Sequence, residues 1–355
     1  MQKPVFVLTV NSLAGPGNRW SKIVTCLAGN KTFDFRLIIT QAFYMYVKSL
    51  NNETSASFKK LLKSNIIIYD RTHCKIFNYF VLYCHLTYLR FIGFNTIHSI
   101  MSLPFSLRLK KVFHFRLNYE VVGPVYADKI IRNEQNRHID RFICVSPSIA
   151  ERIKLNKKLE EKIFTYPIPF YKYNKVCLPE AKKNIVVFAH NFMVTRKNAT
   201  LCAFLFAEIA PLYPDWSFYL LGKGRDGDAS YSNLYKYLFE DQENIIFTHL
   251  RDISPVLARS KIFLSLNSIN NYPSQSVLEA MQYDNYLIIT DTGQSKDFVL
   301  ENGVLVNVDY DDIKNALVLA MEDTSLEKKG KNSSILLKNR FAPEVFIQSL
   351  IDLYS

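Results

Sequence analysis

Closely spaced cysteines are missing from this sequence. It has six cysteines in 355 residues, but they are scattered through apolar surroundings and no two form a Cys-x-x-Cys pair. This spacing gives no sign of a disulfide framework or a structural zinc site, so a reducing cytoplasm is the expected compartment. We also see no His/Asp/Glu cluster at the spacing of metal ligands, and no metal is predicted.

The start of the sequence lacks the long apolar core of a secretory signal peptide. The run at 5–10 is short and passes into a polar turn without a cleavage site. We interpret it as a first strand. Short repeats and low-complexity tracts are missing too, which argues against a solenoid.

Acidic residues are scarce in the first half. Residues 1–180 hold 27 Lys and Arg against 11 Asp and Glu, whereas residues 181–355 hold 17 against 21; the net charge is +12. This asymmetry indicates a surface that meets nucleic acid, anionic lipid headgroups or a phosphorylated substrate, and a solvated surface without a partner is the alternative. Because no nucleic-acid reader motif accompanies the basic residues, no nucleic-acid partner is expected.

Short apolar runs alternate with segments of helical length, which is typical of parallel sheets covered by helices. The pattern appears twice and, with the length of the chain, predicts two α/β domains, 1–170 and 184–340, joined by a linker at 171–183. A helix at 341–355 is expected to pack back towards the N-terminal domain. The predicted strands are 5–10, 35–40, 65–69, 111–115, 142–145 and 162–166, then 184–188, 216–221, 244–248, 262–266, 287–290 and 304–306.

One aromatic and aliphatic stretch, residues 76–94, does not fit a plain α/β pattern. It is long enough to span a membrane, but Asn78, His85 and Arg90 would make that costly. A helix buried against the first sheet is one interpretation. The other is a helix at the surface of a bilayer, with Arg108, Lys110 and Lys111 meeting anionic headgroups.

Polar residues follow two predicted strands of the second half. Arg196 and Lys197 come after the strand at 184–188, where ligands of open α/β sheets bind, and are candidates to contact a diphosphate. The strand at 216–221 runs into Gly222, whose turn permits close backbone approach to a ligand, although such a turn is a weak motif.

The most specific segment is 270–281, Asn-Asn-Tyr-Pro-Ser-Gln-Ser-Val-Leu-Glu-Ala-Met. Pro and Ser indicate a loop that opens a helix, so free N–H groups near its start suit a diphosphate. Glu279, one turn inside, is a candidate acceptor for ribose hydroxyls. A further turn, Thr290-Asp291-Thr292-Gly293, follows the next strand. The candidates at the helix start are Ser274, Gln275, Ser276 and Val277.

These motifs together resemble the retaining GT-B glycosyltransferases of family 4, which build bacterial surface polysaccharides. The resemblance extends along nearly the whole chain but is specific only from Asn184 to about Glu322. It implies two Rossmann-like, doubly wound domains facing a central cleft. It also implies that Lys197 contacts the donor diphosphate, that residues 274–277 supply backbone amides, and that Glu279 binds the ribose.

The sequence departs from the family at two places. Asn270 and Asn271 stand where the family has a glutamate that contacts the donor sugar; they keep hydrogen bonding but not the charge. Phe192 stands where an arginine usually precedes the lysine. In the first half, Gly17 resembles the family's glycine-rich turn near the donor, and His114 occupies roughly the place of a histidine near the transferred sugar, although a histidine on an apolar strand is more often simply packed.

The resemblance implies a hexosyltransferase that is metal-independent and needs no cofactor beyond its donor substrate, a nucleoside diphosphate sugar. The acceptor is expected to be a saccharide, either lipid-linked or part of a surface polysaccharide, and the enzyme to sit in the cytoplasm on the anionic inner face of the plasma membrane. The alternative is a relative that binds a nucleotide sugar or a partner protein without transfer.

Overall fold

The computed structural model divides the chain into two compact units. Unit 1 comprises Met1–Tyr173 and Phe341–Ser355, and unit 2 comprises Asn174–Arg340. The described residues are 2–8, 16–29, 34–49, 53–62, 65–68, 70, 74–100, 103–132, 134–170, 181–190, 195–222, 235, 237–248, 252–272 and 274–355.

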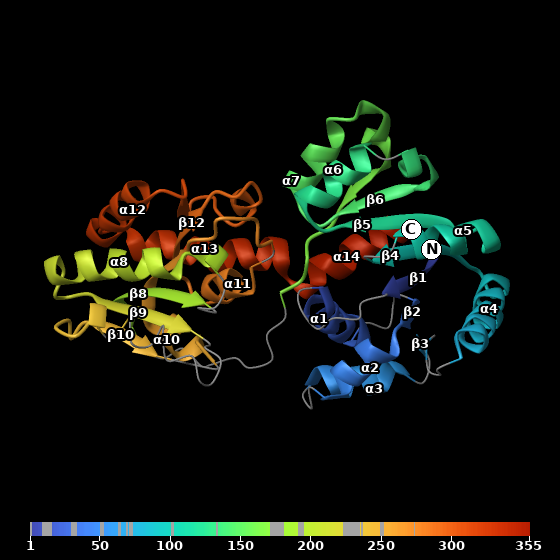
Figure 1. Ribbon diagram of the computed structural model, residues 1–355, viewed down its shortest axis with the longest axis horizontal. Coiled ribbons are helices and arrows are strands. Elements are labelled where there is room, and N and C mark those ends of the chain that lie inside the picture. Colours follow the sequence, from blue (N-terminus) through green and yellow to red (C-terminus); the bar gives the residue numbers. More distant parts are fainter. Residues whose placement is uncertain are drawn as a thin grey trace. The chain divides into compact units, whose positions relative to one another are not determined.

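Unit 1 is built on a seven-stranded sheet whose paired strands run parallel, in the order β3-β2-β1-β4-β5-β6-β7. This is the doubly wound order, with the reversal between β1 and β4. Figure 1 shows the sheet with its helices. The strands are β1 (Lys3–Leu8), β2 (Arg36–Ile39), β3 (Ile66–Ile68), β4 (Phe94–Ile100), β5 (Arg116–Val121), β6 (Arg141–Cys144) and β7 (Ile163–Thr165).

The last helix of the chain belongs to unit 1. Helix α14 contacts α1, and the Gln2 N–H donates to the Tyr354 carbonyl at 2.5 Å. The unit therefore has helices from both ends of the chain. They are α1 (Pro16–Gly29), α2 (Gln41–Ser49), α3 (Glu53–Leu62), α4 (Lys75–Phe91), α5 (Leu103–Phe113), α6 (Pro124–Arg132), α7 (Pro147–Lys154) and α14 (Pro343–Tyr354).

Two expectations for this half were wrong. Of the segment predicted as a strand at 111–115, residues 111–113 end α5 and residues 114–115 connect it to β5, which begins only at Arg116. The strand β4, which pairs with both β1 and β5, was not predicted. Its buried polar residues, Thr96, His98 and Ser99, interrupt the apolar run that marks a central parallel strand.

Helix α4 buries only a narrow stripe. Asn78, Leu82, Leu86 and Leu89 are buried, at the spacing of one helical face. The interpretation of 76–94 as a helix that packs against the first sheet holds for this stripe, which contacts β4, whereas most of the other α4 side chains are exposed. No helix in the described ranges is both long and apolar enough to cross a membrane.

Unit 2 repeats the doubly wound plan with six strands in the order β10-β9-β8-β11-β12-β13. Each neighbouring pair of these strands runs parallel. The strands are β8 (Lys183–His190), β9 (Ser217–Gly222), β10 (Ile245–Thr248), β11 (Ser260–Ser265), β12 (Tyr286–Thr290) and β13 (Gly303–Val306); the helices are α8 (Ala199–Ile209), α10 (Ser254–Arg259), α11 (Gln275–Gln282), α12 (Tyr310–Glu322) and α13 (Leu326–Phe341).

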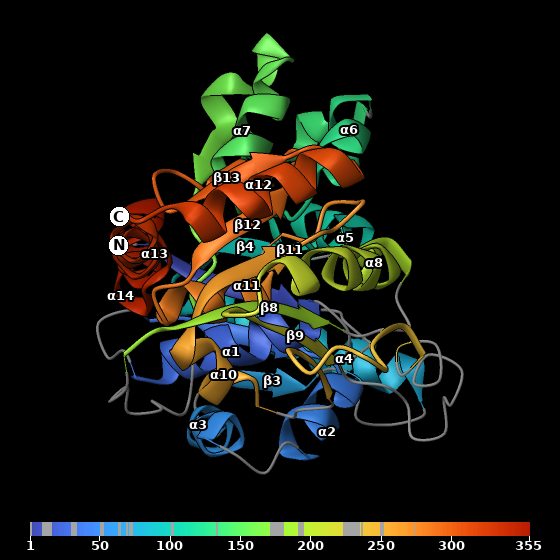
Figure 2. The same cartoon turned by 90° about the vertical axis from the view of Figure 1, so that its left-hand side faces the viewer.

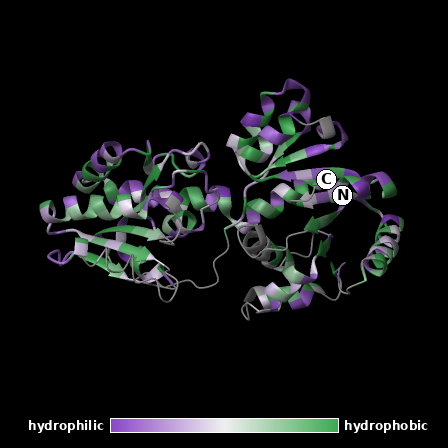
Figure 3. Ribbon diagram, viewed as in Figure 1, coloured by the Kyte–Doolittle hydropathy of each residue, from purple (hydrophilic) through white to green (hydrophobic). Residues whose placement is uncertain are grey.

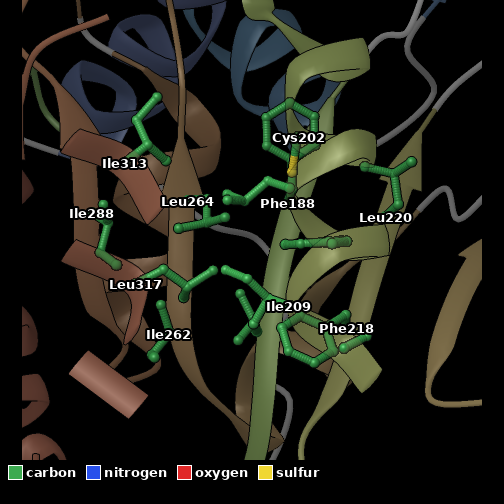
Figure 4. Packing of buried hydrophobic residues seen from close by; sticks show 14 of the residues in the cluster. Phe188, Cys202, Ile209, Phe218, Leu220, Ile262, Leu264, Ile288, Ile313 and Leu317 are labelled. Atoms are coloured by element: carbon green, nitrogen blue, oxygen red, sulfur yellow. The ribbon is translucent and has the colours of Figure 1, made fainter. Parts of the chain in front are cut away.

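The main core of unit 2 lies between the sheet and two helices. Phe188 and Leu264 on the strands meet Cys202 of α8 and Leu317 of α12 (Figure 4). Figure 2 shows α8 and α12 over the same face of this sheet. The alternate residues of these strands, such as Val187, point to the opposite face of the sheet and are buried there as well. On that face α10 packs on β8 and β11. Burial on both faces explains the nearly continuous apolar runs of these strands.

Candidate functional site

The strand order of unit 2 reverses between β8 and β11, and ligands of doubly wound sheets bind beyond the carboxyl ends of the strands at such a point. The short turn Thr195–Lys197 follows β8. Ser268, after β11, donates to the Arg196 carbonyl from its N–H at 2.8 Å and its Oγ at 3.1 Å. Asn198 Nδ2 donates to the Leu266 carbonyl at 2.8 Å. These bonds hold Arg196 and Lys197 at the reversal point.

The two cations differ in their surroundings. Arg196 is exposed, whereas Lys197 is half-buried. Burial, together with the smaller effect of the neighbouring Arg196 charge, lowers the pKa of Lys197 to about 8. An anion at this point would relieve both effects, because an opposite charge favours the protonated amine.

A hollow of about 230 Å³ lies at the ends of β11 and β12. Much of this volume is open to solvent, and the enclosed part has room for only about one water-sized group. Its lining is mainly small and polar. The residues are Ser265, Asn267, Asn270, Asn271, Tyr272, Ser274, Val277, Ile289, Thr292, Gln294, Ser295 and Phe298.

The two predicted asparagines both line this hollow. Asn270 Nδ2 donates to Oε1 of Gln294, which is buried. A neutral amide pair thus occupies the place where the family resemblance puts a carboxylate. Gln294 was not predicted as a site residue, because it follows the turn Thr290–Gly293 and no local motif distinguishes it.

Asn267 is the second lining residue that was not predicted. It is only 6% exposed, and its Nδ2 donates to Ser265 Oγ at 2.9 Å. Its Oδ1 is buried with no hydrogen-bond partner among the described residues. Leaving a buried acceptor unpaired costs about 1–3 kcal/mol. A ligand hydroxyl that donates to Oδ1 would remove this cost, so Asn267 is a candidate to bind a ligand. A lone Asn after a strand gave no sequence signal.

Helix α11 opens beside the hollow. Its N-cap residue, Ser274, is buried and lines the hollow with Val277, so the N-terminal end of the helix lies at this wall. The first N–H groups of a helix have no partner inside it and attract anions. Gln275, Ser276 and the half-buried Glu279 lie on the same helix but outside the lining of the hollow.

Side chains fix the turn at the opposite wall. Thr290 Oγ1 donates to the Asn267 carbonyl at 2.6 Å, and Ser295 Oγ donates to the Thr290 carbonyl at 2.8 Å. Gly293 has φ of 91°, which glycine adopts without strain, and its N–H donates to Asp291 Oδ1 at 2.8 Å. The β12 turn is thereby tied directly to Asn267.

The predicted site residues of the first half are not gathered in this way. His114 lies between α5 and β5, is exposed and has φ of 54°; the expected position at the end of a strand was wrong. Gly17 lies in the first turn of α1. Gly222 is the buried last residue of β9, and the glycine-rich turn after it lies outside the described residues, as does Phe192.

A buried polar cluster lies on the sheet of unit 1. His98 Nδ1 is 2.6 Å from the Tyr354 hydroxyl, and Asn118 Nδ2 donates to the same oxygen at 3.4 Å. Tyr166 donates to the Glu120 carboxylate. The bonds of Tyr354 join β4 and β5 to α14, and the bond of Tyr166 joins β5 to the segment after β7.

No group of three or more His, Cys, Asp or Glu is placed to hold a metal ion in the part of the chain that the structure describes. The sequence contains an Asp-x-Asp run of the kind that can hold a metal, Asp309-Tyr310-Asp311, but it lies at the start of α12. Asp309 accepts hydrogen bonds from the Asp311 and Asp312 N–H groups and caps α12.

The sequence of unit 2 resembles a known family. Residues 183–323 match the family model described as glycosyl transferases group 1. This segment contains the turn with Lys197, the hollow and α11. No curated protein sequence matches the chain.

Solved structures resemble the whole chain at low sequence identity. A glycosyltransferase from Rickettsia africae has a TM-score of 0.70 at 13% identity, covering 99% of this chain and 97% of that one. Anabaena HepE in complex with UDP has a TM-score of 0.72 at 14% identity, covering 99% of each chain. Sucrose-phosphate synthase from Thermosynechococcus elongatus has a TM-score of 0.69 at 15% identity, covering 100% and 98%. The predicted GT-B fold, with its two Rossmann-like units, is thereby confirmed, and residues 183–323 carry the sequence signature of the glycosyl transferases group 1.

Proposed function

We propose that this protein is a glycosyltransferase that moves a hexose from a nucleoside diphosphate sugar to a hydroxyl of a lipid-linked or surface-polysaccharide acceptor, with retention at the anomeric carbon. One observation carries the proposal. The segment that matches the family model brings Lys197, Asn267 and the start of α11 to the point where the strand order reverses.

The proposed chemistry follows from these groups. The bond from the anomeric carbon to the diphosphate breaks with its electron pair leaving on the diphosphate oxygen. The acceptor oxygen bonds to that carbon and passes its proton to the departing diphosphate. A protonated Lys197 and the first N–H groups of α11 would stabilise the charge that develops on the leaving group, so the proposal needs neither metal nor cofactor.

Neutral groups would orient the sugar. Asn267 Oδ1 accepts, and Asn270 with Gln294 both donates and accepts, so each suits sugar hydroxyls. Glu279 would bind the ribose, a role that comes from the family resemblance. We place the enzyme in the cytoplasm at the inner face of the plasma membrane, which agrees with the excess of Lys and Arg in residues 1–180.

Donor binding is the direct test. We expect one nucleotide sugar among UDP-, GDP- and other derivatives to raise the melting temperature of the protein, because a ligand bound only by the folded state stabilises it. Replacing Lys197 with Ala should remove most of this shift, whereas Lys328→Ala, at an exposed position on α13, should keep it. A panel without any shift for the parent protein would overturn the proposal.

The second candidate is a relative that binds the donor but does not transfer the sugar. The Asn270 and Gln294 pair favours it, because two neutral amides replace a charged contact. Restoring the carboxylate with Asn270→Glu tests this, since Gln294 can still donate to it. An enzyme should gain turnover with a lipid-linked acceptor. If parent and variant both bind the donor but neither transfers nor hydrolyses it, the non-catalytic alternative holds; an inverted product would rule out retention.

A further inference from the structure

Helix α4 presents a wide apolar face to solvent. Single exposed apolar residues are ordinary, but a contiguous group marks an interaction surface. Figure 3 shows the hydrophobic character of α4 along its length. The exposed residues, with their exposed fractions, are Ile76 (83%), Phe77 (53%), Tyr79 (55%), Phe80 (63%), Tyr83 (54%), Tyr88 (61%) and Phe91 (88%).

Helix α5 extends this surface. The Tyr83 and Phe113 rings lie 5.0 Å apart and join the two helices. On α5, Arg108, Lys111 and Val112 are exposed at the spacing of one helical face. We define the exposed residues of α4 with these three as the α4–α5 surface.

The charge on this part of the chain has one sign. No Asp or Glu occurs between Arg71 and Tyr119. Of the lysines on α5, Lys110 is held in an ion pair with Asp140 at 2.5 Å, so it is not available to an outside partner. Arg108 and Lys111 are exposed beside the aromatic face, and Arg90 is exposed at the end of α4.

We propose that the α4–α5 surface docks the protein on an anionic lipid bilayer, with α4 lying along the interface and its Phe and Ile side chains inserted. An apolar face with a basic rim is the pattern of interfacial helices, and Tyr suits the headgroup level because its ring is apolar and its hydroxyl polar. A twofold contact with a second copy would instead set the exposed Arg108 and Lys111 of one copy near those of the other. Lipid headgroups carry the complementary charge.

This inference extends the proposed location of the protein but does not depend on its chemistry. Docking through α4 and α5 requires no donor. Each variant below is therefore also tested for the melting-temperature shift with the nucleotide sugar, which reports on unit 2 alone. A variant that loses vesicle binding but keeps the melting-temperature shift tests docking alone. A protein that binds vesicles but shows no shift with any nucleotide sugar counts against the proposed function alone.

The test uses the full chain and flotation with vesicles of phosphatidylcholine, with or without phosphatidylglycerol. We expect binding to the anionic vesicles and weaker binding to the neutral ones. The double variant Ile76→Ser/Phe80→Ser should lower the partition coefficient by at least about tenfold, because two inserted side chains are lost. Leu319→Ser, at an exposed position on α12 in unit 2, is the matched control and should bind as the parent does.

The charges are tested with a second pair of variants. Arg108→Gln/Lys111→Gln should weaken binding to anionic vesicles by roughly fivefold for each charge. Lys59→Gln/Lys60→Gln removes the same charge from exposed positions on α3 and should have a much smaller effect. Added salt should weaken the parent in the same direction.

Three results would overturn the proposal. One is a parent protein that floats with neither vesicle. Another is an Ile76→Ser/Phe80→Ser variant that binds anionic vesicles as tightly as the parent while circular dichroism shows an unchanged fold. The third is a dimer that the same variant converts to a monomer, or tight binding to an oligonucleotide, without vesicle binding; these would assign the surface to a second copy or to nucleic acid.

Discussion

Lys197 is the predicted site residue with the clearest physical signature. Its pKa of about 8 comes from burial and from Arg196, and the bonds from Ser268 keep the turn at the strand-order reversal. The sequence predicted this position from a strand followed by a cation. Asn267 and Gln294 were not predicted because they belong to no motif themselves, and only folding buries both of them at the same hollow.

The pKa of Lys197 leads to a pH-dependent donor affinity. A diphosphate binds the ammonium form and raises its pKa, so affinity should be full below about pH 8 and fall above it, by up to about tenfold per pH unit. Lys197→Arg should bind without this fall because the guanidinium stays charged. Calorimetric titration with the preferred nucleotide sugar at several pH values measures it. An equal fall in the Arg variant would assign the titration to another group.

Asn267 allows the effect of a site residue on donor binding to be measured separately from its effect on stability. Its Oδ1 is buried without a partner among the described residues. Asn267→Leu removes that acceptor at similar volume and also the bond to Ser265, so the two effects should offset and change the melting temperature little while donor binding weakens. Asn285 is the matched control. It is fully buried, accepts from Ser260 and donates to the carbonyls of Leu257 and Ala280, so Asn285→Leu should cost about 3 kcal/mol or more. Equal destabilisation by both variants, in denaturant titrations, would contradict this role for Asn267.

At the scale of elements, the strands of unit 2 were the most predictable. The central strands β8, β11 and β12 have one face in the main core and the other against α10 or α11, so apolar runs such as 184–188 are easily recognised. Strand β4 was not predictable, because the partner of His98 Nδ1 is Tyr354, a residue of the last helix. The sequence alone does not reveal this distant partner, and polar residues in a central strand contradict the apolar run expected of a parallel sheet.

A glycine in β13 sets a sharp test of strand packing. A Cβ on Gly303 would lie 2.3 Å from the carbonyl oxygen of Leu287, its pairing partner in β12, so the backbone of one strand would have to move. Gly303→Ala should destabilise unit 2 by about 1–3 kcal/mol. Gly293→Ala is the control, because its Cβ meets nothing within 4 Å and only its φ of 91° opposes the change, at about 1 kcal/mol. If chemical denaturation shows a smaller loss of unfolding free energy for Gly303→Ala than for Gly293→Ala, β13 can move away from β12 at little cost.

At the scale of the whole chain, the last helix returns to the first unit. Helix α14 follows all of unit 2 in sequence, yet Tyr354 bonds to His98, and Arg141 Nη1 donates to the Leu353 carbonyl at 2.9 Å. Phe346 packs against Tyr166, with ring centroids 5.3 Å apart. Unit 1 is therefore complete only after the whole chain has been made.

Loss of α14 should consequently unfold unit 1 and spare unit 2. The helix buries five large side chains, and at about 1.5–3 kcal/mol each they match the whole stability of an ordinary domain, about 5–15 kcal/mol. They are Phe346, Ile347, Leu350, Leu353 and Tyr354. We expect a chain ending at Ala342 to lose amide-exchange protection in β1 and β4 but keep it in β8 and β11.

Tyr354→Phe is the milder variant, since it removes only the hydroxyl that joins His98 and Asn118. It should lower the free energy of unfolding of unit 1 by about 1–3 kcal/mol. Equal loss of protection in both sheets would mean instead that the two units unfold together, and unchanged protection in β4 would show that the buried polar cluster does not need α14.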